Sequence, residues 1–587
     1  MSIGRGSGRR IPAETVRVAR ASNPGGTPAM WMRDRLDEVF VDDDFADWFP
    51  ADGRRGLSPA MVSVLQYAEN LTDRQAAQAA RCRIDWKYCL ARELTDPGFD
   101  HSVLSEFRDR LAVDDRADRL LAVLAERLAA AGLVKRRGRM RTDSTHVLAA
   151  VRKLNRVELV GETLRAALED LADADEQWLA QLLDAGWAKR YGRPVRYDRV
   201  PREKEELAAH VLQFGEDGMR LLRAVYRDDA PPRLRGLPRV QVLRQVWVQQ
   251  YWYNENGQLS WHGPKDTHDR ATRRGAPRRK AGPGEASPDP GSARVPWSRM
   301  EIVTPHDSKA RFAHRTGKAA WVSYKDHQTE TCDPAGPNVI VHVATQAAPE
   351  QDVSMLEEIH QALARRKILP AEHLVDAGYT TPAAIHQAAT RYGITLLGPV
   401  CLISPRQSHP GFDKQDFHIN WDQRTVTCPR GITSPPWHPI AQDGQDGHSF
   451  LFPRKACREC ADHLKCTGNA AGRGRHLILL PQPLQEIQNR ARIEQKTLDW
   501  KARYAMRAGC EATVSETVHA HGLRHCRYHG LARTHVQHVL AAAGTNIIRL
   551  SECFPPGTTP LRTPRPKSGF QRLCQNLFAN HSTAPTQ

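Results

Sequence analysis

The order of short apolar runs between residues 318 and 400 limits the fold more than any other feature of this sequence. Segments 318–333 and 338–346 alternate apolar and polar residues and are separated by the turn sequence PAGP, which predicts a β-hairpin. The segments that follow alternate between helix and strand, at 354–367, 372–379, 381–392 and 394–400. Two strands followed by alternating helices and strands predict an α/β core whose sheet is partly parallel.

Helical segments precede and interrupt this core. We expect disorder at 1–28, a helical N-terminal DNA-binding domain at 29–132, and a core that runs over 133–552. An insertion at 152–298 would combine helices with a flexible basic linker, because 263–296 are rich in Lys, Arg, Pro and Gly and nearly lack large apolar residues. The remaining segments are an irregular, cysteine-containing insertion at 401–483, helices at 484–520 and 533–550, and a disordered basic tail at 553–587.

The chain is strongly basic. Its 84 Lys and Arg residues exceed its 67 Asp and Glu residues, for a formal net charge of +17. Such a surface concentrates polyanions, of which nucleic acid is the commonest, although a genome rich in Arg codons would produce the same balance. We find no apolar run long enough for a membrane span and no apolar stretch of a secretory signal at the N-terminus. We therefore expect a cytoplasmic protein.

Residues 71–91 have the residue pattern of a helix–turn–helix unit. Thr72 is placed to cap a first helix, and a turn at 82–84 would lead into a second helix that carries Trp86 and Lys87. A unit of this kind can place its second helix in the major groove of DNA. Any small helical bundle would have the same pattern, so both interpretations stay open.

Two aspartates stand where strands are expected to end. The segment 136–148 predicts a short strand that ends at Asp143, and the polar residues after it could cap a following helix. Asp376 directly follows the apolar residues of the strand expected at 372–379. Taken singly, Asp143 is more simply a helix cap and Asp376 a turn residue. Taken together on one sheet, they form a candidate pair of metal-binding carboxylates.

A third carboxylate lies in the sequence YAMRAGCE. Tyr504, Arg507 and Glu511 are spaced i, i+3 and i+7, so a single helix would place all three on one face. The set suits a phosphodiester: the carboxylate would hold a metal ion, the guanidinium would contact phosphate, and the phenol would support the backbone or a base. A solvated helix face with an i, i+4 Arg–Glu pair is the simpler interpretation of this segment alone.

Four of the twelve cysteines are close in sequence, with the spacing C-x28-C-x2-C-x5-C: Cys428, Cys457, Cys460 and Cys466. Zn²⁺ prefers four tetrahedral nitrogen or sulfur ligands, and the C-x2-C pair has the spacing of a zinc knuckle. Only one such pair is present, and His463 could replace one thiol. A structural Zn²⁺ site and a set of reduced, unliganded cysteines therefore both stay open.

These motifs, in this order, resemble the DDE transposases of bacterial insertion sequences. RTDSTHV and HLVDAGYTTP are similar to the family's first two acid motifs, with Asp143 and Asp376, and YAMRAGCE is similar to the third, with Glu511. The branch with the signature Tyr-x2-Arg-x3-Glu-x6-Lys is the most similar. Its Lys falls on Val518 here, and the neighbours that could substitute for it are His519, His521 and Arg524. The resemblance covers about residues 30–552.

The resemblance implies an RNase H-like mixed-sheet core with a helical N-terminal domain and two insertions. It implies that Asp143, Asp376 and Glu511 hold two Mg²⁺ ions, with Mn²⁺ as the alternative metal, for phosphodiester hydrolysis and transesterification. The partners would be double-stranded DNA, as terminal inverted repeats and target, and a second copy of the chain in a homodimer on the DNA. Such a protein would be cytoplasmic and associated with the nucleoid.

Several residues are expected to contact DNA. They are Tyr504 and Arg507, from the third acid motif, and the basic residues Lys309, Arg311, Lys325 and Arg524. Surface Lys and Arg, however, are usually only solvated. Two alternatives to a transposase remain. One is a catalytically inactive, domesticated sequence-specific DNA-binding protein, against which the three intact acids argue. The other is a nuclease of the same fold that cuts without joining.

Overall fold

The structure is a computed structural model that describes residues 10–36, 59–130, 132–152, 154–262, 301–313, 321–334, 336–401, 409–442, 445–468 and 474–553. The chain divides into two compact units. The N-terminal unit combines Met1–Arg110 with Ala543–Gln587, and the core unit comprises Leu111–Ala542. The basic linker expected at 263–296 and nearly all of the tail expected at 553–587 lie outside the described residues.

The N-terminal unit is helical, as its sequence predicts. Its helices are α1 (Ala13–Ser22), α2 (Pro28–Leu36), α3 (Pro59–Ala68), α4 (Asp73–Cys82), α5 (Ile84–Cys89) and α6 (Ser102–Leu111). The disorder expected over 1–28 is wrong for its described part, because α1 packs Ala19 against Met30 and Tyr88. A ten-residue helix is marginal on its own, so these tertiary contacts account for its presence.

Residues 71–91 do form two helices joined by a short turn. Thr72 and Gln75 make a reciprocal capping box at the start of α4. In α5, however, Trp86 and Lys87 are buried, and Lys87 Nζ donates to the carbonyls of three residues in the following loop, Glu93, Leu94 and Asp96. The second helix is therefore a packing helix, and its interpretation as a DNA-recognition helix is wrong.

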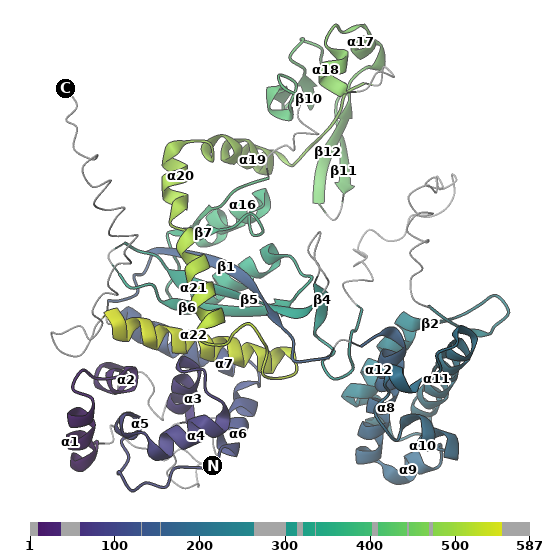
Figure 1. The fold of residues 1–587 in the computed structure, drawn as a ribbon. Helices are drawn as coiled ribbons and strands as arrows, with labels where there is room; N and C mark the ends of the chain where they lie inside the picture. Colours follow the sequence, from purple (N-terminus) through teal and green to yellow (C-terminus); the bar gives the residue numbers. More distant parts are fainter. Residues whose placement is uncertain are drawn as a thin grey trace, which may run out of the picture. The chain divides into compact units, whose positions relative to one another are not determined.

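A six-stranded mixed sheet forms the centre of the core unit (Figure 1). Its strands are β1 (Arg139–Leu148), β4 (Arg311–Ala313), β5 (Trp321–Thr331), β6 (Ile340–Ala347), β7 (Glu372–Val375) and β8 (Thr395–Leu397). The order is β4–β5–β1–β7–β8, and β6 also pairs with β5. β1, β7 and β8 are parallel, whereas β5 is antiparallel to β1, β4 and β6. The predicted hairpin and the partly parallel sheet are confirmed.

Strand β1 is longer than expected. It does not end at Asp143 but continues to Leu148, and no helix starts at the polar residues after Asp143. The reason is the partner strand, because β5 pairs with β1 from Met140 to Leu148 and takes up its backbone groups. Ser, Thr and Asp favour helix caps locally, but here a long-range backbone ladder overrides that preference.

Further helices of the core unit connect the strands of this sheet or pack against it. η4 (Asp352–Met355) and α15 (Leu356–Arg365) connect β6 to β7, and α16 (Pro382–Tyr392) connects β7 to β8. α7 (Arg116–Ala130) precedes β1 and packs against β6. The helical stretch expected at 484–520 is three helices, α19 (Gln482–Glu494), α20 (Leu498–Ala505) and α21 (Ala508–His519), and α22 (Leu531–Cys553) comes last. No helix in the described residues is long and apolar enough to cross a membrane.

The first insertion is helical, as predicted, and it also contains a short hairpin. Its elements are α8 (Arg156–Ala174), α9 (Glu176–Ala180), α10 (Ala185–Tyr191), η2 (Tyr197–Arg199), α11 (Lys204–Val225), η3 (Pro232–Gly236), α12 (Pro238–Gln250), β2 (Tyr251–Tyr253) and β3 (Leu259–Trp261). They share one hydrophobic core that includes Trp187, Phe214 and Trp247. This core is large enough to explain why the helices form a coherent body within the insertion.

The second insertion, 401–483, was expected to be irregular, and this expectation is wrong. It contains η5 (Lys414–Asp416), β9 (His418–Asn420), β10 (Thr425–Thr427), β11 (His438–Gln442), β12 (Gln445–Leu451), α17 (Arg454–Glu459), α18 (His463–Thr467) and β13 (His476–Leu479). The strands have three to seven residues, which is too short for a clear period-two pattern. The pairing of β12 with both β11 and β13 gives this insertion its sheet.

Candidate active site

The two aspartates predicted at strand ends come together in the sheet. β1 and β7 run parallel, and their last paired residues are Thr142 and Val375. Asp143 and Asp376 are the next residues along each segment, so this register places them level with each other. Asp143 also pairs with Gln328 of β5, in the middle of its strand. The parallel register thus brings both carboxylates to the point where β7 ends.

Helix α21 crosses the sheet and packs against β1, the strand that carries Asp143 (Figure 1). Alternate residues of a strand share a face, so Arg141 lies on the same face as Asp143. The Arg141 guanidinium donates to Glu330 Oε1 at 2.7 Å and to the carbonyl of Met506 at 2.6 Å. The hydroxyl of Thr513, on α21, lies 2.8 Å from both carboxylate oxygens of Glu330. These contacts fix the beginning of α21 against β1.

Gly509 permits the close approach of α21 to β1. A Cβ atom at this position would lie 2.2 Å from Nη1 of Arg141, and the guanidinium is held in place by its hydrogen bonds. We therefore expect Gly509→Ala to lower the free energy of unfolding by about 1–3 kcal/mol, although alanine favours helix by about 1 kcal/mol. Urea denaturation followed by circular dichroism measures the change. Ser515→Ala, on the exposed side of α21, should change it by less than about 0.5 kcal/mol, and equal effects would contradict the packing argument.

Arg507 connects two of the three predicted acids. Its Nη2 lies 2.7 Å from Asp143 Oδ1, and its Nη1 lies 2.5 Å from Glu511 Oε1. The side chains of Arg507 and Asp143 are each 12% exposed, whereas that of Glu511 is 67% exposed. The i, i+4 Arg–Glu pair is therefore present, but it is not a solvated surface pair, because its guanidinium is largely buried and shared with Asp143.

The single helical face predicted for Tyr504, Arg507 and Glu511 is wrong in its geometry. Tyr504 is the penultimate residue of α20, Glu511 lies in the first turn of α21, and Arg507 occupies the tight turn between the two helices. The Tyr504 ring stacks on Trp500 with 4.7 Å between centroids. Burial raises the pKa of Tyr504, and the charges of Arg507 and of all three acids also act on it. Tyr504 therefore lies near the acids, but from the end of a separate helix and not from the same helical face as Glu511.

Negative charge collects around Asp143. Burial raises the pKa of this carboxyl from its usual 3.8 to about 6; Arg507 and the Ser144 N–H lower it, and Asp376 and Glu511 raise it further. The donors are carboxylate oxygens, which Mg²⁺ prefers, and a guanidinium already neutralises part of their charge. The residues therefore fit a divalent ion in chemistry. In the part of the chain that the structure describes, no three His, Cys, Asp or Glu residues are arranged to hold a metal as they stand.

Sequence reasoning missed a fourth carboxylate beside the site, Asp352. A Cβ atom on Gly378 would lie 2.9 Å from Asp352 Oδ2 and 3.0 Å from Asp376 Oδ1, so both carboxylates flank this glycine. Asp352 Oδ1 also accepts a hydrogen bond from Lys325 Nζ at 2.7 Å. Lys325, predicted to contact DNA, thus has a carboxylate partner here. No motif surrounds Asp352 in the sequence, and only the fold reveals its position.

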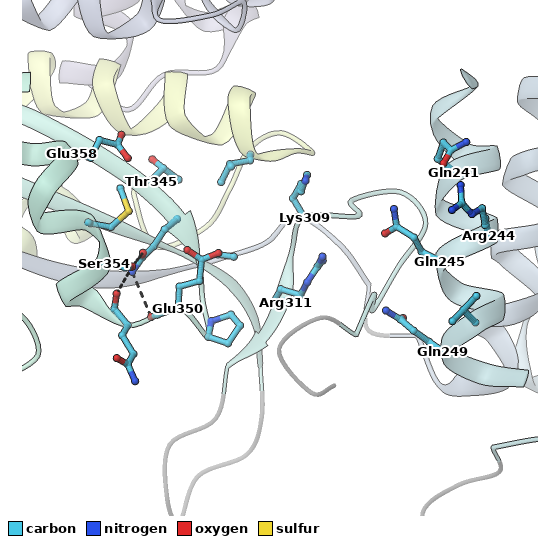
Figure 2. Close-up of a pocket in the computed structure, with 17 residues that line it drawn as sticks. Gln241, Arg244, Gln245, Gln249, Lys309, Arg311, Thr345, Glu350, Ser354 and Glu358 are labelled. Atoms are coloured by element: carbon cyan, nitrogen blue, oxygen red, sulfur yellow. Dashed lines mark hydrogen bonds between the residues drawn. The ribbon is translucent and has the colours of Figure 1, made fainter. Parts of the chain in front are cut away.

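Lys309 and Arg311 are not part of this acidic site. They line a separate cavity of about 1050 Å³ to which β6 and α12 also contribute. Figure 2 shows both side chains between the α12 helix, which carries Arg244, and the wall that carries Glu350 and Glu358. The cavity therefore has three cationic side chains but a mixed charge.

Two further positions bear on the resemblance. Arg524 Nη1 donates to the carbonyl of His146 at 3.1 Å, beside the second half of β1. Val518, where the signature has Lys, is 4% exposed within α21, so this position faces the protein interior. Of the other neighbours considered as substitutes, His521 is buried and His519 is exposed.

The four cysteines of the second insertion converge on one small cavity. Cys428 follows β10, Cys457 lies in α17, Cys460 follows α17, and Cys466 lies in α18. All four are free thiols. Burial raises the pKa of Cys466 to about 11; the charge of Arg475 lowers it, and the other three thiols raise it.

Two family models match separate parts of this chain. Residues 18–110 match a transposase domain, DUF772, and residues 427–551 match a transposase DDE domain. The first match spans most of the N-terminal unit's helices. The second spans β11, β12 and β13 of the cysteine-containing insertion and nearly all of α19–α22, with Glu511, but neither Asp143 nor Asp376. Comparisons with curated proteins and with solved structures found no match.

Both models describe transposases, a class of enzyme that cuts and joins DNA. The two matches indicate a transposase, and DNA is the class of substrate on which such proteins act. Together they support a DDE transposase of an insertion element. DDE transposase domains generally use divalent metal ions, typically Mg²⁺.

Proposed function

We propose that this chain binds the terminal inverted repeats of its insertion element, cuts the DNA at their ends and joins them to target DNA. The matches to transposase families support cutting and joining in general. The observation that carries the site is Arg507, which contacts both Asp143 and Glu511 where the β1–β7 register also brings Asp376. We assign these three carboxylates as the catalytic acids of an RNase H-like core.

Asp143, Asp376 and Glu511 would hold two Mg²⁺ ions, or Mn²⁺. When bound, such ions activate a water or a DNA 3′-hydroxyl and stabilise the leaving oxygen. Asp143, Glu511 and Arg507 would have different roles in the site. Asp143 is held on a buried strand and supplies a fixed carboxylate, and the exposed Glu511 is free to turn toward DNA. Arg507 balances the acids without DNA and is placed to contact a phosphate when DNA binds.

Basic side chains away from the acids would hold the DNA backbone. Lys309, Arg311 and Arg244 face one cavity, and such contacts position DNA without reading its sequence. Because two ends of an element must be joined in one event, we propose that two copies of the chain act together on DNA. The net charge of +17 supports nucleic-acid binding.

Linear DNA that carries the element's own terminal repeats tests the proposal. With Mg²⁺, the wild-type chain should cleave at the repeat ends and join them to a target plasmid, and EDTA should prevent both steps. Asp376→Asn and Glu511→Gln should lose cleavage and joining but still retard repeat DNA in a gel. Binding without cleavage by the wild type would instead indicate a DNA-binding protein, and cleavage without joining a nuclease. Full activity in the acid variants would show that the site is misassigned.

A further inference from the structure

We propose that the second insertion is a zinc-binding module in which Cys428, Cys457, Cys460 and Cys466 hold one structural Zn²⁺ ion. The proposal is independent of the proposed active site, because none of these four cysteines lies among the described contacts of the three acids. It concerns the stability of the segment between α16 and α19. Transposition chemistry would not occur at this ion.

The backbone holds each thiol from a different local structure. Cys428 sits in a tight turn, in which its N–H donates to the Ile432 carbonyl and its carbonyl accepts from the Gly431 N–H, each at 2.8 Å. Gly431 has φ of +78°, a value that favours glycine. Cys457 and Cys460 enclose the end of α17, with a backbone hydrogen bond of 3.3 Å between them. A C-x2-C pair and a tight turn are common supports for zinc ligands.

The space enclosed by the thiols suits a single ion. All four cysteines line one cavity of about 20 Å³, and a cavity of this size holds about one water-sized species. The thiols do not stand at metal-ligating positions in this structure. Zn²⁺ binding would therefore require their side chains to turn inward around a cavity that they already surround.

Nearby charge favours a thiolate cluster. Four cysteine thiolates around one Zn²⁺ carry a net negative charge, and two guanidiniums, those of Arg430 and Arg475, line the same cavity. The Arg430 guanidinium also forms an ion pair with Asp462, so Arg475 is the cation that lacks a carboxylate partner among the described ion pairs. Nε of Arg475 is a buried donor without a hydrogen-bond partner in the described residues. A thiolate sulfur held on the metal would give this donor an acceptor.

The insertion also has little else to stabilise it. Its core consists mainly of five aromatic side chains, one valine and one leucine, and two of the cysteines complete it. These core residues all lie within the 68 positions from Phe412 to Leu479, and modules below about 70–80 residues commonly need a metal or disulfides in addition to a small core. Since the cysteines are all free thiols, a metal ion is the cross-link that fits them.

Metal analysis of the reduced full-length protein tests this proposal. After incubation with ZnCl₂ and desalting, we expect one Zn²⁺ per chain, and we expect Cys457→Ser and Cys466→Ser to lose it. Cys401→Ser, an exposed thiol outside the cavity, should keep one Zn²⁺. Asp143→Asn should also keep it, which separates this site from the proposed active site. No zinc in the wild type above the buffer blank would overturn the proposal, as would zinc that Asp143→Asn removes.

A measurement on the wild type alone covers the case in which the cysteine variants fail to fold. Alkylation followed by peptide mass spectrometry should show that Zn²⁺ protects the four thiols together and that a chelator exposes them together. The thiol of Cys401 should react equally under both conditions. Equal labelling of all the cysteines with and without Zn²⁺, or disulfides among the four, would contradict the proposed site.

Discussion

Asp143→Asn should reduce the rate of DNA cleavage by about 10³-fold or more. In the absence of metal, the same substitution should raise the free energy of unfolding. The loss of activity follows from the proposed role, because removing a ligand of the catalytic ions costs several kcal/mol of transition-state stabilisation, and each 1.4 kcal/mol is about tenfold in rate. The gain in stability follows from burial. Asp143 is 12% exposed, and its neighbours include two further carboxylates.

The sign of the pH dependence follows from the pKa of Asp143, which is raised from 3.8 to about 6 in the folded protein. Above pH 6 the carboxyl is ionised in both the folded and the unfolded chain, and its burial disfavours folding. As the pH falls from 6 to 4, the folded protein takes up the proton first, so the penalty disappears. Asn carries no charge. Its advantage should be about 2–3 kcal/mol at pH 7.5 and vanish below pH 4.

Urea denaturation in EDTA at several pH values measures the stability difference, and the repeat-end cleavage assay measures activity. Asp499→Asn is the matched control, because this carboxylate on α20 is 83% exposed and should affect neither quantity. A stable but inactive Asp143→Asn protein excludes unfolding as the cause of the loss. A variant that cleaves DNA at the wild-type rate would remove Asp143 from the proposed site.

Glu330→Ala should lower the free energy of unfolding by about 3–5 kcal/mol, because it leaves the buried Arg141 guanidinium without its carboxylate. Glu330 is completely buried on β5, and its oxygens contact Arg141 and Thr513. Arg141 also holds the carbonyl of Met506, in the turn before Arg507. The same change should therefore loosen the start of α21 and reduce DNA cleavage.

Urea denaturation of three variants separates the buried charge from other effects. Glu494→Ala removes a carboxylate from an exposed i, i+4 pair with Arg490 and should cost less than about 0.5 kcal/mol. Adding Arg141→Met to Glu330→Ala should recover part of the loss, because the unpaired charge is then gone. If Glu330→Ala and Glu494→Ala have equal effects, the buried pair does not hold α21 as we argue.

Much of the core could be predicted because its signals are local. The alternating residues of β5 and β6, with PAGP between them, and the short apolar run before Asp376 lead to the observed hairpin and to β7. The choice of Asp143, Asp376 and Glu511 also came from the sequence, through their order and their resemblance to a family. What remained open was geometry, because the 232 residues between the first two acids do not indicate that β1 pairs with β7.

Tertiary contacts overrode local preference at several places. The polar residues after Asp143 favour a helix cap, but β5 pairs along them and extends β1 to Leu148. Residues 484–520 read as continuous helix, yet the chain turns at Met506 and Arg507, where Arg141 from β1 holds the Met506 carbonyl. The helix that carries Lys87 had a possible interpretation as a DNA-recognition helix, but Lys87 is buried against loop carbonyls. In the first two cases a partner distant in sequence supplies the deciding hydrogen bonds, whereas Lys87 is held by carbonyls six to nine residues further along the chain.

The sequence alone determined the class of this protein, because the residue types and order of its acid motifs, the basic charge and the cysteine spacing are properties of composition and spacing. Only the tertiary structure decided how these residues meet. The β1–β7 register brings Asp376 beside Asp143, the turn before α21 lets Arg507 reach both Asp143 and Glu511, and the fold adds Asp352, which no motif indicated. The physical reason is that a strand register and a buried ion pair depend on partners far along the chain, which no local pattern specifies.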